Sequence, residues 1–183
     1  ADWPISYDDL APYYERAEWE VGVADDRTEA ESHWPRQRGY PMPPMPLSPQ
    51  GALLRAGAAQ LGWDTFGIPA LLNTIPYGGR PACIRCPYCV GSPCPVDAKN
   101  GTQNTLIARA LTSGRCELLT ETVVHNIDTD EAGHDIGVSY LDGSGQPHSA
   151  RAAVVICAGG AIETARLLLC STSARHPHGL GNA

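Results

Sequence analysis

Four cysteines lie within twelve residues of this chain, at positions 83, 86, 89 and 94, and a proline follows the last of them. Cysteine thiolates held this close together are the usual ligands of iron–sulfur clusters and of structural zinc. Four residues separate Cys89 from Cys94, one more than the ferredoxin-type run has before its final Cys-Pro. The spacing predicts a metal or redox centre at Cys83, Cys86, Cys89 and Cys94, with an iron–sulfur cluster, a zinc ion and unligated or disulfide-bonded thiols as the alternatives.

The remaining cysteines do not share this spacing. The chain has seven in all, an odd number concentrated in one segment, which is typical of a metal or redox site and not of a disulfide framework. Cys116, Cys157 and Cys170 fall in expected strands or helices, so we expect them to be small buried hydrophobic residues. This cysteine usage leaves the cellular compartment open.

A second candidate site follows the run AAVVICAGG, which is apolar throughout and ends in two glycines. The next residues, AIETARLLLCS, have helical spacing at Ile162, Ala165 and Leu169. A buried strand that leads into a helix is typical of α/β nucleotide-binding sheets. Glycines at this turn allow a cofactor to approach the backbone, although a plain strand-to-helix turn is the alternative, since no complete G-x-G-x-x-G is present.

Composition excludes several other functions. The 183 residues are 43% apolar and carry a net charge of −7, and Lys and Arg do not cluster as binding to phosphate backbones or anionic lipids requires. We therefore expect that the chain neither binds nucleic acid nor contains a membrane segment. No G-x-S-x-G elbow or Walker A loop occurs in the sequence, and the six histidines lack the spacing of metal ligands, so hydrolase and kinase functions find no support.

The elements before the cysteines are two expected helices joined by a proline-rich connector. Ser6 and Asp9 form a capping pair, and Pro12 suits a first turn, which predicts a helix over residues 10–21. Six prolines between residues 34 and 49 predict an extended connector. Ser48 then begins a second helix, rich in small residues and expected to be buried, which Gly62 ends in a left-handed cap.

The elements after the cysteines are expected to be a short helix and several strands. Residues 102–114 form the helix, with Leu106, Ala110 and Leu111 facing inward. The segments ELLT, TVVHNIDT and IGVSYLD, separated by turn-rich pieces, predict an antiparallel meander. The expected fold class is α/β, or α+β if the chain is a fragment.

Four segments, in this order, resemble the glucose-methanol-choline (GMC) family of flavin oxidoreductases. They are WPISYDDLAPYYERAE, CVGSPCPVDAKNGTQNTLIARAL, AVVICAGGAIETARLLLCS and HGLGN. The resemblance extends from Asp2 to Asn182 and is nearest to the bacterial branch of sugar, gluconate and alcohol dehydrogenases. It implies a Rossmann-type FAD domain and the oxidation of a small alcohol or sugar, with hydride passing to the flavin.

The resemblance also implies roles for particular residues. Val124 would present its backbone to the adenine of FAD, and Ala158 and Gly159 would lie near the dinucleotide. It implies that residues 1–115 are substrate-domain and lid elements with the cysteine-rich loop, and that residues 116–183 are part of the FAD-binding domain. The family's G-x-G-x-x-G loop and its catalytic histidine correspond to positions before Asp2 and after Asn182, so no catalytic residue is assigned, and we expect this piece alone to be inactive.

The cysteine segment resembles one that holds a three-iron cluster in the sugar dehydrogenase branch and passes electrons to a haem subunit. Those relatives have an adjacent cysteine pair after a Gly-Arg-Pro, whereas this chain spreads the thiols over Cys83, Cys86 and Cys89. Two alternatives stand beside a dehydrogenase. One is a stand-alone cysteine-rich electron-transfer or metal-binding module, and the other is an oxidase that passes electrons to oxygen and has structural cysteines.

Overall fold

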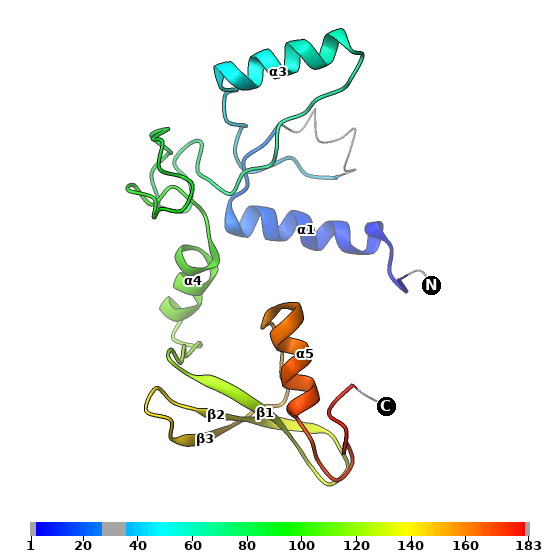
Figure 1. The fold of residues 1–183 in the computed structure, drawn as a ribbon. Coiled ribbons are helices and arrows are strands. Elements are labelled where there is room, and N and C mark those ends of the chain that lie inside the picture. The colour runs from blue at the N-terminus through cyan, green and yellow to red at the C-terminus, as the bar shows by residue number, and fades with distance from the viewer. Residues whose placement is uncertain (1–2, 27–35, 182–183) are drawn as a thin grey trace. The chain divides into compact units, whose positions relative to one another are not determined.

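The computed structural model describes residues 3–26 and 36–181, and the chain divides after Cys116 into two compact units. Figure 1 shows helices and loops in the first unit and a small sheet with one helix in the second. This content of helices and antiparallel strands is consistent with the expected α/β class. None of the described helices has the length and apolar content needed to cross a bilayer. The assignment of the two segments to substrate and FAD domains stays a prediction.

The first helix, α1, spans Tyr7–Val21 and begins at the expected capping pair. The Ser6 hydroxyl accepts the Asp9 backbone amide at 3.3 Å. The Ser6 amide and hydroxyl donate to the Asp9 carboxylate at 2.9 and 2.7 Å, and these two bonds hold the pKa of Asp9 below its usual value. The expected start at residue 10 is therefore wrong. Because the capping box fixes the first turn, Pro12 lies inside the helix and not at its start.

The described part of the proline-rich connector, residues 36–48, has no helix and no strand, as predicted, but it bends at residues 37, 38 and 41, and residues 34 and 35 lie outside the described residues. It packs against the chain after α1, where the Asp25 amide donates to the Met42 carbonyl at 3.2 Å. Ala24 also exchanges backbone hydrogen bonds with Ala70, and both Ala24 and Met42 are buried. These short bridges form the small core of the first unit.

The second described helix, α3, spans Pro49–Gln60 and has both predicted caps. Ser48 accepts the Gly51 amide at 3.0 Å, and the amides of Gly62 and Trp63 donate to the carbonyls of Ala59 and Ala58, with Gly62 at φ +70°. This pattern is a Schellman motif. The expected burial is wrong, since no residue of α3 is buried and Leu53 is 76% exposed.

The predicted helix over residues 102–114 is divided into a 3₁₀ turn, Thr102–Asn104, and the helix α4, Leu106–Thr112. Thr105 separates them and donates its hydroxyl to the Gly101 carbonyl at 2.6 Å. The prediction that three side chains of this helix face inward is only partly confirmed. Ala110 is half-buried, whereas Leu106 and Leu111 are exposed.

The second unit contains the predicted antiparallel meander, with β1 at Val123–Thr129, β2 at Asp135–Leu141 and β3 at Pro147–Arg151. Ile127 pairs with Val138, and Val138 pairs with Ala150. The expected strand at 117–120 is absent from the sheet, and the polar strand β3 takes the third place instead. Cross-strand pairing with β2 overrides the turn-like composition of β3.

The helix α5, Gly160–Cys170, is confirmed and contacts β1. Its half-buried residues are Thr164, Leu167 and Leu168, whereas the expected face of Ile162, Ala165 and Leu169 is exposed. At its end, the buried Ser171 accepts the Ile127 amide at 2.9 Å and donates to the Leu167 carbonyl at 2.7 Å. This hydroxyl joins α5 to the middle of β1.

The predicted buried strand before α5 is the clearest disagreement. Residues 153–158 form no strand pairing in the described chain, and Val154 and Ile156 are 74% and 85% exposed. A central parallel strand needs hydrogen-bonding neighbours on its edges, and residues 153–158 pair with none of the three described strands. The expectation that all three isolated cysteines are buried is also wrong, because Cys116 and Cys170 are exposed and Cys157 is half-buried.

Gly137 gives a test of the meander. A Cβ added there would lie 2.1 Å from the Ala150 carbonyl oxygen, and φ is +156°. We expect Gly137→Ala to destabilise the second unit by about 1–3 kcal/mol. Gly145→Ala is the matched control, because its position is open and only its φ of +78° is strained. If thermal unfolding showed that Gly137→Ala loses no more stability than Gly145→Ala, the pairing register of β2 with β3 would be contradicted.

The turn between β2 and β3 gives a pH dependence. The half-buried Asp142 carboxylate accepts bonds from Ser144, Gln146 and His148, which lower its pKa. Its contribution to stability is therefore present above the ordinary carboxyl pKa, near 4, and is lost as the pH falls through the lowered value. We expect Asp142→Asn to reduce amide-exchange protection at Gln146 at neutral pH, and the difference from wild type to vanish in strong acid. Asp135→Asn, at the start of β2, is the control. If the difference in protection between Asp142→Asn and wild type did not depend on pH, the role of the Asp142 carboxylate would be refuted.

Candidate functional site

The glycine turn at the start of α5 lies beside the sheet and lines a hollow of about 350 Å³ in the second unit. Val124 from β1 lines the same hollow as Ala158 and Gly159, although more than thirty residues separate them in the sequence. Apolar side chains form much of the remaining wall, namely Val123, Val138, Val155, Ile156 and Leu167. The structure therefore brings together the three residues that the resemblance associates with FAD.

The geometry of the turn leaves the backbone accessible. Gly160 has φ +84°, a conformation that favours glycine, and a Cβ there would meet no atom within 4 Å. The Thr164 hydroxyl accepts the Gly159 amide at 3.1 Å and so ties the turn to the first turn of α5. An exposed glycine turn at a helix N-terminus with an apolar wall fits part of a dinucleotide cofactor.

The four clustered cysteines line one small hollow of about 240 Å³ in the first unit. Ile84, Tyr88, Val96, Leu71 and Leu72 supply an apolar lining around the sulfur atoms. In the described part of the chain, no three Cys, His, Asp or Glu side chains converge as a bound metal ion requires. The loop thus places four thiols around a shared space without forming a finished coordination site.

Backbone amides point at two of these thiols. The Arg85 amide donates to Cys83 Sγ at 3.3 Å, and the Ala98 amide donates to Cys94 Sγ at 3.2 Å. Hydrogen bonds from the backbone of Val96, followed by those from Ala98 and Lys99, lower the pKa of Cys94. Amide donors to sulfur stabilise thiolate over thiol, and this soft donor set is the chemistry that iron–sulfur centres use.

The cysteine segment also has an unusual backbone. Arg85 and Asp97 have φ of +56° and +54°, two of the three non-glycine residues with positive φ in the described chain. Lys99 donates its ammonium to the Cys89 carbonyl at 2.9 Å and so connects the middle of the loop to its end. Strained residues persist where the surrounding contacts fix them, which is common at functional sites.

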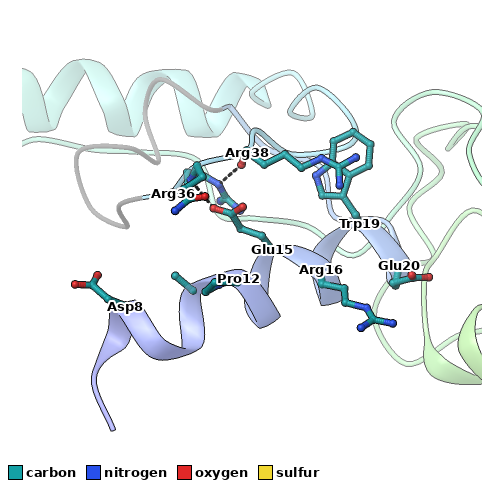
Figure 2. A pocket seen from close by; sticks show the side chains of 10 residues that line it. Asp8, Pro12, Glu15, Arg16, Trp19, Glu20, Arg36 and Arg38 are labelled. Carbon is teal, nitrogen blue, oxygen red and sulfur yellow. Dashed lines mark hydrogen bonds between the residues drawn. The ribbon is translucent and has the colours of Figure 1, made fainter.

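Further hollows, which the sequence did not predict, lie along α1. One, of about 490 Å³, is shown in Figure 2 and is lined by Asp8, Glu15, Trp19 and other α1 residues together with residues 36–38. The Arg38 guanidinium lies over the Trp19 ring at 3.3 Å, and the Trp19 indole donates to the Gly39 carbonyl at 2.8 Å. The connector is thus held on α1 by a cation–π contact that its composition did not reveal.

The second hollow, of about 830 Å³, is aromatic and apolar. Its lining includes Tyr7, Tyr14, Tyr40, Ile68 and Leu71. Arg36 contributes to both hollows, forms an ion pair with Glu18 and lies over the Tyr40 ring at 3.7 Å. Burial raises the pKa of Glu18 even though Arg36 lowers it, and burial likewise raises the pKa of Tyr40.

Comparison with known protein families gives a match over nearly the whole chain. The model of the family described as GMC oxidoreductase matches residues 3–183. The chain belongs to the GMC oxidoreductase family. Members of this family typically bind FAD, and the match covers both units, which does not favour the alternative of a stand-alone cysteine-rich module.

Several curated proteins are similar over nearly the whole chain. The fructose dehydrogenase large subunit of Gluconobacter japonicus is 33% identical over 184 residues, covering 100% of this chain and 33% of that protein. The 6'''-hydroxyparomomycin C oxidase of Streptomyces lividus is 35% identical, covering 98% and 33%. The 2-methyl-1,2-propanediol dehydrogenase of Mycolicibacterium austroafricanum is 30% identical, covering 100% and 32%. The chain thus spans about one third of the length of these relatives.

Proposed function

We propose that the protein carrying this chain is an FAD-dependent oxidoreductase that oxidises the CH–OH group of a sugar, polyol or alcohol. Residues 116–183 would form part of a Rossmann-type FAD domain, and residues 1–115 would supply substrate-domain and lid elements. The observation that carries the proposal is the shared hollow of Val124, Ala158 and Gly159. The relatives named for fructose, hydroxyparomomycin C and a propanediol support a hydroxyl-bearing substrate.

The residues of this chain would bind and orient, and none is assigned to proton transfer. When bound, FAD supplies the hydride acceptor for oxidation of the alcohol. The backbone of Val124 would meet the adenine end, and the open turn at Ala158 and Gly159 would allow close approach of the dinucleotide. The apolar wall around Leu167 would keep water from this part of the cofactor.

The electron acceptor distinguishes two versions of this function. We propose a dehydrogenase in which Cys83, Cys86, Cys89 and Cys94 hold an iron–sulfur cluster as the electron exit, with a haem subunit as acceptor. Support comes from the shared thiol hollow and from the relative named a large subunit, which implies a second subunit in that protein. An oxygen-using oxidase is the second candidate, because the 35% identical relative is named an oxidase. Oxygen consumption during turnover of the full-length protein separates the two.

Gly159 gives the test of the flavin site. A Cβ added there would meet Glu163 Cβ at 3.4 Å and the Thr164 amide at 3.6 Å, which are ordinary contacts, and φ is −79°. Gly159→Ala should therefore fold normally but weaken FAD binding on the order of tenfold, since one misplaced methyl group costs about 1–3 kcal/mol. Gly57→Ala, in an open position of α3, is the control. Equal FAD affinity of the two full-length variants, measured by flavin fluorescence titration, would argue against a close approach at Gly159.

Metal analysis tests the cysteine site. In full-length protein prepared without oxygen, we expect iron and labile sulfide together with a charge-transfer absorption beyond that of flavin. Cys94→Ser should lower bound iron several-fold, whereas Cys116→Ser, an exposed cysteine outside the thiol hollow, should not. A wild-type protein with flavin but no iron or sulfide would rule out the cluster and leave the flavin proposal intact.

A further inference from the structure

Asn73 connects the two ends of the cysteine loop through its own backbone. The Asn73 carbonyl accepts the Cys83 amide at 2.7 Å, and the Asn73 amide donates to the Ala98 carbonyl at 2.8 Å. The Ala98 amide in turn donates to Cys94 Sγ at 3.2 Å. A continuous path of hydrogen bonds therefore runs from Cys83 through Asn73 and Ala98 to Cys94.

The Asn73 side chain holds the turn that precedes Cys83. Its amide nitrogen lies 3.1 Å from the Tyr77 carbonyl oxygen, 3.4 Å from that of Arg80 and 3.2 Å from that of Pro81. Tyr77 and Arg80 also exchange backbone hydrogen bonds at 3.0 Å across two glycines with positive φ, as in a two-residue hairpin turn. One fully buried amide thus satisfies carbonyls all along this turn.

Asn100 completes the arrangement on the other side of the loop. Its side-chain nitrogen donates to Asn73 Oδ1 at 3.0 Å and to the Gly22 carbonyl at the end of α1. Its side-chain oxygen accepts the Arg80 guanidinium, which also donates to the Asp97 carbonyl at 2.9 Å. Asn73 is 0% exposed and Asn100 is 6% exposed, so water competes little for the bonds that the Asn100 side-chain nitrogen donates.

We propose that Asn73 is the positioning residue of the cysteine loop, and that its side-chain amide fixes the separation of Cys83 from Cys94. The inference rests on the proposed role of the four thiols as one ligand set. A loop between two fixed ends samples far fewer arrangements than one with a free end, so the thiols between them stay near one another. An amide side chain supplies two N–H donors, one of which is shared between two of the three carbonyls, together with an oxygen that accepts from Asn100.

Asn73→Ala in the full-length protein, freed of metal by a chelator, tests the proposal. The substitution leaves buried carbonyls and the Asn100 amide without partners, which favours local opening of the loop. We expect iodoacetamide to label Cys83 and Cys94 on the order of tenfold faster, as followed by peptide mass spectrometry. Cys157 and Cys170, in the second unit, are internal references whose rates should not change.

Two further variants keep the test decisive. Thr74→Val removes a hydroxyl that donates to the Pro43 carbonyl at 2.7 Å, outside this network, and should leave all labelling rates unchanged. Arg80→Lys keeps the charge but loses the paired bonds to Asp97 and Asn100, so it should accelerate the same two thiols to a smaller extent. Amide hydrogen exchange in α3 of Asn73→Ala reports whether that substitution unfolds the whole first unit. If it does, the labelling rates of Arg80→Lys are used to judge the proposal instead.

The outcomes separate this inference from the proposed cluster. If wild type holds iron, Asn73→Ala should lower bound iron and change its absorption spectrum, while Thr74→Val should not. If wild type holds no iron, the cluster proposal fails, but the labelling rates of Cys83 and Cys94 still test the positioning role of Asn73. Unchanged rates at Cys83 and Cys94 in both Asn73→Ala and Arg80→Lys would overturn the positioning role.

Discussion

The arrangement of the first unit depends on the hydrogen bonds of the buried Asn73. Its backbone joins Cys83 to Ala98, and its side chain reaches the turn at Tyr77 and the amide of Asn100. Apolar burial alone does not hold these segments, since the buried apolar residues of this unit are few and include Val23, Ala24, Met42 and Ala98. Because an unpaired polar group in such a position is costly, the loops around Asn73 are confined to the conformations that satisfy it.

Ser171 has the corresponding role in the second unit. Its buried hydroxyl accepts from the Ile127 amide and donates to the Leu167 carbonyl, so that the end of α5 is bonded to the middle of β1. With α5 fixed on β1, the glycine turn at its other end lies beside Val124 in one hollow. A buried polar side chain therefore helps to hold the residues of the candidate flavin site together, the role that we propose for Asn73 at the thiols.

Local signals in the sequence predicted most of the elements. The caps at Ser6 and Ser48, the glycine end of α3 and the strand segments TVVHNIDT and IGVSYLD with the turns between them are each recognised over a few residues, and all appear in the structure. Burial was predicted less well, since Leu53 and Ile162 are exposed despite apolar patterns. Burial depends on which segment packs opposite, and Asn73 gave no local sign because its partners lie up to 27 residues away.

The glycine turn was predicted correctly and the strand before it was not, because the turn depends on local contacts and the strand on distant ones. The turn needs only the Gly159–Thr164 bond and the first residues of α5, which lie within a few positions of one another. Residues 153–158 have the composition of a central parallel strand, whose stability comes from neighbours that crossover connections place far away in the sequence. The described meander offers no such neighbour, so Val154 and Ile156 stay exposed. A flavin site built on both segments therefore requires pairing of residues 153–158 before its apolar wall becomes rigid, because only the turn is fixed by local contacts.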